Sequence, residues 1–292
     1  MRTGVDLGGT KIEAVVVDDG GCVVARQRMA TPAGDYVATV RAIVTVVGEV
    51  EAAAGGGGSS LGIGVPGSPS PTTGLMRNCN STALNGRQLG ADLTEAIHRP
   101  VHMANDANCL ALSEAFDGAG RGASTVFAII LGTGVGGGVV VDGHLVQGIN
   151  GVGGEWGHIP LPWPTPAELP GDTCWCSRSG CLETWLSGPA LEAQWRSADG
   201  APMSATDIAS GHGESEVMQQ WLDRLARATA VIIDILDPDV IVVGGGLNAI
   251  DAIYTDVPRR WPQYVFSDEV HTRIVPAMHG DSSGVLGAAR LG

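Results

Sequence analysis

The chain has 292 residues, 44% of them hydrophobic, and a formal net charge of −14. This length and composition allow two domains with packed cores. The acidic excess disfavours nucleic acid and anionic membrane surfaces as partners, because both are bound by clustered lysine and arginine. A bound phosphate would therefore depend mainly on backbone N–H groups and a metal ion.

The sequence shows no sign of export or membrane insertion. The N-terminal segment, MRTGVDLGGT, lacks the long apolar core and small-residue cleavage site of a signal peptide. No run of 18 or more apolar residues is present, so we expect no transmembrane span. Three of the six cysteines, Cys22, Cys79 and Cys109, are scattered. These features predict a cytoplasmic protein with reduced thiols.

The first elements of the chain predict a β-hairpin followed by a helix. A short strand at 3–6 runs into the turn Gly8-Gly9-Thr10, and a second strand resumes at 12–17. Apolar residues at helical spacing then predict a helix over 36–54.

A glycine- and serine-rich run at 55–60 could be an interdomain linker. A strand at 61–65 follows it at once, so we interpret the run as a flexible helix-to-strand loop within one domain. Another short strand, at 101–104, leads into Asn105-Asp106 and a helix over 107–117.

A second hairpin follows the pattern of the first. A buried strand at 125–131 enters the glycine-rich turn 132–138, and a partner strand is expected at 139–142. Strand, glycine turn and strand therefore occur twice. This weak internal repeat indicates two halves of similar core that face each other.

The last third of the chain contains a third glycine run. A helix is predicted over 222–236, a turn at 237–239 and a strand at 240–243. Gly244-Gly245-Gly246 follows directly after that strand.

Three cysteines lie close together in the sequence and are preceded by a histidine. Cys174, Cys176 and Cys181, with His158, offer three thiolates and an imidazole. This ligand set suits a closed tetrahedral zinc site, and four protein ligands leave no open position for catalysis. We therefore predict a structural zinc ion that holds a loop. Buried or disulfide-bonded cysteines are the alternative that the spacing leaves open.

The same stretch resembles the signature of the ROK family, which comprises bacterial sugar kinases and related repressors. That signature is close to G-E-x-G-H followed by C-x-C-G-x-x-G-C-x-E, and it matches 154–158 and 174–183. Ser177 stands where the family usually has glycine. If this position requires a positive φ, serine costs roughly 1 kcal/mol of strain.

The glycine-rich segments resemble the nucleotide-binding loops of the actin-like superfamily. Glycines let backbone N–H groups approach phosphate oxygens, Thr10 adds a hydroxyl donor, and Asp6 can act through Mg²⁺ by way of water. Considered alone, the first glycine-rich segment, 6–11, also fits an ordinary hairpin turn with a solvated Lys11. The resemblance implies that ATP contacts Asp6, Gly8, Gly9, Thr10, Lys11, Gly132, Thr133, Gly134, Gly244, Gly245 and Gly246.

The resemblance also implies the catalytic and sugar-binding residues. Asp106 occupies the position of the carboxylate that accepts the proton of the attacking hydroxyl. Asn-Asp is equally an ordinary helix N-cap. His158 is expected to serve both zinc and a sugar hydroxyl, which would explain a structural zinc in a kinase. The implied sugar ligands are Gly67, Asn80, Asn105, Asp106, Glu155, His158 and Glu183.

The resemblance covers nearly the whole chain and implies a two-domain α/β sugar kinase of the actin-like, ribonuclease-H-like class. The smaller domain would comprise 1–117 together with a returning helix in 280–292, and the larger domain 118–279. The active site would lie in the cleft between them. Dimerisation is implied by the family alone.

The expected reaction is transfer of the ATP γ-phosphoryl group to the 6-hydroxyl of a hexose. The tracts NCNSTALNG, HIPLPWP, ILDPDVIVVGGG and HGDSSGVLGAA look most like bacterial fructokinases that also accept mannose. D-fructose is therefore the first expectation. Glucokinases and N-acetylhexosamine kinases share every catalytic residue named above. A ROK repressor is disfavoured, because its DNA-binding domain would precede the loop that starts here at Gly4.

Overall fold

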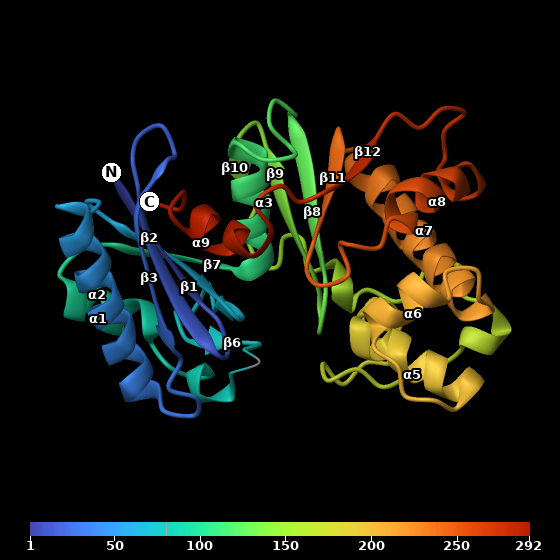
Figure 1. The fold of residues 1–292 in the computed structure, drawn as a ribbon, viewed down its shortest axis with the longest axis horizontal. Helices are drawn as coiled ribbons and strands as arrows, with labels where there is room; N and C mark the ends of the chain where they lie inside the picture. The colour runs from blue at the N-terminus through green and yellow to red at the C-terminus, as the bar shows by residue number, and fades with distance from the viewer. Residues whose placement is uncertain (80) are drawn as a thin grey trace.

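The computed structural model describes residues 1–79 and 81–292, and its fold consists of two sheets with helices around and between them (Figure 1). The two main sheets have five strands each, and a separate two-stranded sheet pairs β5 (Ser68–Pro69) with β6 (Met76–Arg77). One predicted sugar ligand, Asn80, lies outside the described residues.

The first sheet has the strand order β3-β2-β1-β4-β7. β1 pairs antiparallel with β2, and β2 with β3, whereas β4 and β7 run parallel to β1. Their bounds are β1 (Arg2–Leu7), β2 (Lys11–Val17), β3 (Val23–Ala30), β4 (Leu61–Val65) and β7 (Val101–Asn105).

The second sheet repeats this arrangement in the order β10-β9-β8-β11-β12. β8, β9 and β10 form the antiparallel part, and β11 and β12 run parallel to β8. The bounds are β8 (Thr125–Leu131), β9 (Val135–Val141), β10 (His144–Leu145), β11 (Val240–Gly244) and β12 (Arg273–Pro276). The internal repeat predicted from the two glycine turns is confirmed.

Helices cover both faces of the first sheet. α1 (Tyr36–Ala54) packs against β2 and β3, and α2 (Leu89–Ile97) packs beside it. The helix α1 begins at the side chain of Asp35, which caps the N–H of Ala38, and ends at Gly55 in a left-handed conformation. α9 (Ser283–Ala288) covers the opposite face and contacts β1 and β4, so the last helix lies against the first sheet.

A second helix pairs with α9 between the two sheets. α3 (Asp106–Phe116) packs on β8 and β9 and lies against α9 (Figure 1). The two helices approach so closely that a Cβ on Gly287 would overlap the backbone of Cys109. The predicted boundaries at 117 and 279 remain predictions. The observed packing adds that α3 contacts the second sheet more extensively than the first.

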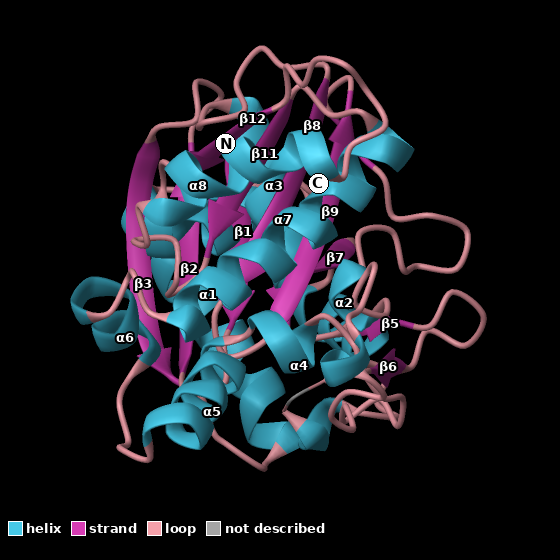
Figure 2. Ribbon diagram, turned by 90° about the vertical axis from the view of Figure 1, so that its right-hand side faces the viewer, coloured by secondary structure: helices cyan, strands magenta, loops and turns pink. Residues whose placement is uncertain are grey.

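The remaining helices lie on the outer side of the second sheet, with α7 and α8 beside its strands and α5 and α6 below them (Figure 2). The buried side chains of Trp221, Leu222 and Leu225 on α7 join the core that includes Phe127 and Ile129 of β8. These helices are α4 (Glu183–Leu186), α5 (Gly188–Asp199), α6 (Ala205–Gly211), α7 (Glu216–Leu236) and α8 (Ala252–Arg260).

Short elements complete the described chain. None of its helices is both long enough and apolar enough to span a bilayer. The short elements are β5 (Ser68–Pro69), β6 (Met76–Arg77), η1 (Thr82–Leu84), η2 (Trp156–His158), η3 (Pro166–Glu168), η4 (Trp261–Gln263) and η5 (Gly280–Ser282).

One predicted strand boundary is wrong. The partner of β8 starts at Val135, not at 139, because the glycines 136–138 lie within β9 and not in its turn. A Cβ on Gly137 would meet the carbonyl oxygen of Gly154 at 2.6 Å, and one on Gly138 would meet that of Ala107 at 2.5 Å. These glycines therefore serve close packing against neighbouring backbone.

Candidate active site

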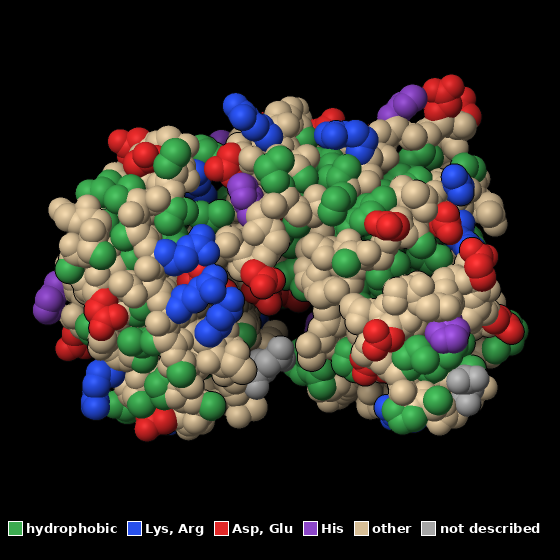
Figure 3. All heavy atoms as spheres, in the orientation of Figure 1, with side chains coloured by type: hydrophobic (Ala, Val, Ile, Leu, Met, Phe, Trp, Pro, Cys, Tyr) green, Lys and Arg blue, Asp and Glu red, His purple; other side chains and the backbone are tan. Residues whose placement is uncertain are grey.

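A cleft of about 390 Å³ lies at the carboxyl ends of the parallel strands of both sheets. The space-filling view shows a groove between the two halves at the lower edge of the molecule (Figure 3). Ligands of open α/β sheets bind at this end of the strands. The cleft brings together eleven of the predicted site residues, namely Gly67, Asn105, Asp106, Gly132, Thr133, Gly134, Glu155, His158, Glu183, Gly245 and Gly246.

The two predicted phosphate loops are equivalent turns of the two sheets. In the first, the Gly8 N–H donates to the carbonyl of Lys11 at 3.0 Å, and Thr31 holds the turn by donating its hydroxyl to the carbonyl of Gly8 at 2.7 Å. In the second, the Gly132 N–H donates to the carbonyl of Gly134 at 3.0 Å. Each turn is closed by its own backbone and held from outside, the first by Thr31 and the second by the Gly188 N–H, which donates to the carbonyl of Gly132 at 2.8 Å. This leaves other backbone N–H groups available to a phosphate.

Asp6 is the last polar residue of β1 and lies near Asp106. Burial, then the negative charges of Asp106 and Glu13, raise the pKa of Asp6 to about 6, and Lys11 partly opposes this. A carboxylate crowded by other acids is stabilised when a cation binds, so this position suits an Mg²⁺-associated role.

Asp106 is the first residue of α3, and it is not the cap of the helix. The cap is Asn105, whose side-chain oxygen accepts from the Asn108 N–H at 2.7 Å. One oxygen of Asp106 accepts from the Ala107 N–H at 2.8 Å, and the side chain is open to the cleft. The surrounding protein restricts hydration, and this desolvation raises the pKa of the Asp106 carboxyl despite the backbone hydrogen bond. The helix-cap alternative therefore applies to Asn105.

Asn105 also orients a second carboxylate. Its amide donates to Glu155 at 3.0 Å, so one side chain both caps α3 and holds Glu155. Burial raises the pKa of Glu155, although His158 and the Asn105 hydrogen bond oppose the shift. The arrangement gives the cleft a row of fixed acceptors for hydroxyl groups.

Glu183 connects the second phosphate turn to the cysteine-rich loop. One oxygen accepts from the Val135 N–H at 3.0 Å, and the other accepts from the indole N–H of Trp175 at 2.6 Å. Trp175 also packs edge-on against His158, with ring centroids 4.9 Å apart, and lines the cleft. Trp175 was not predicted from the sequence. Its position between two cysteines of the cluster is the only signal that could have indicated it.

The four predicted zinc ligands come together in space. Their donor atoms all lie within 4.8 Å of one another. The sulfurs of Cys176 and Cys181 are 3.6 Å apart, and the sulfur of Cys174 is 3.6 Å from Nδ1 of His158. In a tetrahedral zinc site these separations are about 3.8 Å and about 3.5 Å. The residues therefore fit a zinc ion, and none of the six cysteines forms a disulfide.

Ser177 adopts φ 71°, a conformation that favours glycine. The condition under which serine carries strain at this position is therefore met. Gly180, in the same loop, has a similar φ of 72°.

Six predicted nucleotide residues do not line the cleft, namely Asp6, Gly8, Gly9, Thr10, Lys11 and Gly244. The carboxylate of Glu13 is fully buried and forms ion pairs with three cations. Lys11 is 3.5 Å away, Arg26 2.9 Å and Arg28 3.0 Å. Lys11 is therefore engaged with a carboxylate and is not a freely solvated lysine.

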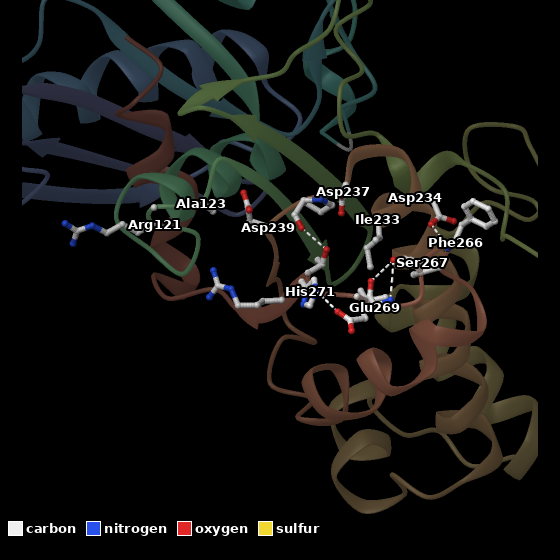
Figure 4. A pocket seen from close by; sticks show the side chains of 16 residues that line it. Arg121, Ala123, Ile233, Asp234, Asp237, Asp239, Phe266, Ser267, Glu269 and His271 are labelled. Carbon is white, nitrogen blue, oxygen red and sulfur yellow. Dashed lines mark hydrogen bonds and ion pairs between the residues drawn. The ribbon is translucent and has the colours of Figure 1, made fainter.

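A larger hollow, of about 1000 Å³, lies at the opposite ends of β8, β11 and β12 (Figure 4). Several polar groups there serve the local backbone. Asp239 accepts from the Thr125 N–H at 2.8 Å, and Asp234 accepts from the Phe266 N–H at 2.9 Å. Because it lies at the amino ends of the strands and these acids are engaged, we assign it no catalytic role.

A family model described as "ROK family" matches residues 2–292. The chain belongs to the ROK family. It is 38% identical to the N-acetyl-D-glucosamine kinase of Yersinia enterocolitica over 300 residues, covering 100% of this chain and 99% of that one.

Two solved structures have the same architecture. The ROK hexokinase of Thermus thermophilus is 31% identical with a TM-score of 0.87, covering 99% of this chain and 96% of that one. The ROK glucokinase of Streptomyces griseus, solved with glucose and AMPPNP, is 29% identical with a TM-score of 0.76, covering 99% and 98%. The chain therefore has the actin-like ATPase fold of the ROK sugar kinases, and a sugar-kinase function is supported.

Proposed function

We propose that this ROK protein transfers the γ-phosphoryl group of ATP to the 6-hydroxyl of a hexose or N-acetylhexosamine. The observation that carries the proposal is the position of Asp106, a carboxylate with a raised pKa that opens into a cleft bordered by a glycine turn. A base near both the acceptor hydroxyl and the donor phosphate is what phosphoryl transfer requires.

Asp106 would accept the proton of the attacking 6-hydroxyl. The hydrogen bond from the Ala107 N–H leaves the second oxygen of Asp106 free to face the substrate. Backbone N–H groups of the turns around Gly9 and Thr133 would hold the phosphates. Mg²⁺, bound with ATP, would neutralise phosphate charge, and Asp6 is the residue that would hold it through water.

The sugar would be oriented by residues from three elements. Asn105 and Glu155 are already joined by a hydrogen bond, and Glu183 is fixed by Val135 and Trp175. Gly67 and Asn80 remain predicted contacts on the far side of the sugar. A zinc ion on His158 and the three cysteines would fix the ring of His158 against the sugar.

N-acetyl-D-glucosamine is the first candidate acceptor, since a kinase with that substrate is 38% identical across the whole chain. D-fructose is the second candidate, because four tracts of the sequence resemble those of bacterial fructokinases. The catalytic residues named here suit both, so the sugar must be decided by experiment.

A coupled ADP-release assay would test the proposal with N-acetylglucosamine, fructose, mannose and glucose at equal concentrations. We expect ATP-dependent turnover, the highest kcat/KM with one of the first two sugars, and a product phosphorylated at C6. Absence of turnover with all four sugars would reject the kinase proposal. A tenfold preference for glucose would reject only the sugar assignment.

We further propose a cytoplasmic homodimer, which the family resemblance implies. Light scattering after size-exclusion chromatography would show twice the mass of 29.8 kDa.

A further inference from the structure

Glu114 is a fully buried carboxylate at the junction of the two halves. It lies on α3, eight residues after Asp106, which places the two about 12 Å apart along one helix. In the described part of the chain no lysine or arginine forms an ion pair with it. A buried charge of this kind must be satisfied by hydrogen bonds.

Four donors satisfy Glu114, and they come from both chain segments that cross between the sheets. The Ala119 N–H, in the crossing from α3 to β8, donates at 2.8 Å. In the crossing from β12 to α9, the N–H groups of Met278 and His279 donate at 2.9 and 3.0 Å. The hydroxyl of Ser283, the first residue of α9, lies 3.1 Å from a Glu114 oxygen and 2.9 Å from the carbonyl oxygen of Gly280, so these two acceptors share its single hydrogen. One carboxylate therefore ties both crossings to α3.

The first turn of α9 lies directly against Asp6. A Cβ built on Gly284 would be 3.2 Å from the carboxyl carbon of Asp6 and 3.3 and 3.4 Å from its two oxygens. Any displacement of this turn would therefore change the position that the Asp6 carboxylate can occupy. Ser283, the neighbour of Gly284, is the residue that Glu114 holds.

We propose that Glu114 is a positioning residue which, through Ser283 and the first turn of α9, fixes the Asp6 carboxylate relative to Asp106. The inference rests on the proposed function, in which Asp6 serves the Mg²⁺ of the nucleotide and Asp106 serves the acceptor. Glu114 touches neither substrate. Its effect is to keep the donor side of the cleft in register with the helix that carries the base.

A matched pair of serine variants separates this role from general stabilisation. Ser283→Ala removes the hydroxyl that links Glu114 to α9. Ser113→Ala is the control, because Ser113 is also buried, adjoins Glu114 on α3, and its hydroxyl has no hydrogen-bond partner among residues 1–79 and 81–292. Glu114→Gln removes the charge and replaces one acceptor oxygen with an NH₂ group, so two of the four donors lose their acceptor.

Calorimetric titration of AMPPNP with and without Mg²⁺, and the Mg²⁺ dependence of turnover, would measure the effect. For Ser283→Ala we expect about a three- to tenfold weaker affinity for the Mg²⁺–nucleotide complex and a similar rise in the Mg²⁺ concentration for half-maximal rate. The sugar KM should stay within about twofold. Glu114→Gln should change the same quantities by about tenfold or more, and Ser113→Ala should match wild type.

The proposal is overturned if Ser283→Ala and Ser113→Ala behave alike, or if the sugar KM rises as much as the Mg²⁺ requirement. Should Glu114→Gln fail to fold, the serine pair still decides. Wild-type protein that binds Mg²⁺–AMPPNP but phosphorylates no sugar would reject the proposed function. The nucleotide titrations of the serine pair would then still test the positioning role.

Discussion

The two halves of the molecule share a sheet plan but differ in what interrupts it. In both sheets an antiparallel hairpin with a glycine turn lies beside two parallel strands, in the same order. In the first half, β2 continues into β3 after a short turn. In the second half, β9 is followed by only a two-residue strand, β10, and then by a long segment with the cysteine-rich loop before the helices begin.

This difference separates two kinds of residue. The repeated part supplies the two glycine turns, one from each sheet. This arrangement suits the binding of phosphates from two sides. The segment without a counterpart supplies Glu155, His158, Trp175 and Glu183, which line the cleft. Asp106 lies between these groups, at the start of the helix that joins the halves. Under the proposed function, the repeated part would contact the nucleotide, and the segment between β10 and α5 (the added segment) would contact the sugar.

The largest expected effect comes from the residue between the halves. Asp106→Asn keeps the size and the Ala107 hydrogen bond but removes the proton acceptor. General-base loss typically costs about 10²–10⁴ in rate, so kcat should fall at least about a hundredfold. Steady-state kinetics with saturating ATP and sugar would measure it.

The zinc content and the fold of Asp106→Asn should stay near wild type, because neither depends on this charge. A variant that kept more than roughly a tenth of wild-type kcat would show that Asp106 is not the base.

The next effect concerns the added segment alone. Wild-type protein should contain about one zinc per chain, and Cys176→Ser should lose most of it, with a lower Tm and a raised sugar KM. Cys22→Ser is the matched control, since Cys22 is exposed and far from the cluster in sequence. Elemental analysis that found full zinc in Cys176→Ser would refute the ligand set.

Sequence patterns predicted the repeated part better than the added one. The helix over 36–54 and the strands over 61–65 and 125–131 agree with the structure to the residue. β3 was not predicted, because its exposed face carries Arg26 and Arg28 and so lacks an apolar run. The start of β9 was misplaced because glycine indicates a turn as readily as close packing.

The candidate site was predicted only as far as short motifs extend. The zinc ligands follow from spacing, and the structure brings them together. The roles of Asn105 as cap and Asp106 as open carboxylate could not be separated in sequence, because both residues cap helices well. The contacts of Glu114 join residues up to 169 positions apart, which no local pattern reports.

Each half also contains a buried carboxylate surrounded by cations, Glu13 in the first half and Glu168 in the second. In the second half, burial alone would raise the pKa of Glu168, but hydrogen bonds from Arg227, from a backbone N–H and from Arg224 outweigh it and lower the pKa to about 2. Because the pKa of Glu168 is lower in the folded state, its carboxylate stabilises the fold at pH values above its unfolded pKa of 4.5. This stabilisation is lost as the pH falls toward 2.

The shift corresponds to about 3 kcal/mol of unfolding free energy at pH 7, and to about half of that at pH 3. Urea unfolding should therefore show that Glu168→Gln is destabilised by about 3 kcal/mol or more at pH 7, with a smaller difference at pH 3. Glu95 is exposed and provides the control. Glu95→Gln should have the same unfolding free energy as wild type at both pH values. An unchanged difference between pH 7 and pH 3 would contradict the ionic role of Glu168.

The smallest expected effect lies in the cysteine-rich loop, where this chain departs from the family pattern. Ser177 has φ 71° and Gly180 has φ 72°, so two residues of one loop adopt the same strained region with different side chains. Ser177→Gly should relieve about 1 kcal/mol of strain and raise Tm by a few degrees, less the entropy that glycine adds to the unfolded chain. Gly180→Ala is the reciprocal change, and it should destabilise the protein, because its Cβ would also meet the carbonyl oxygen of Pro170 at 2.9 Å. Calorimetric melting of the zinc-loaded variants would measure both. If the two substitutions shifted Tm in the same direction, backbone strain would not be what distinguishes the two positions, and the added segment would owe its shape to the metal alone.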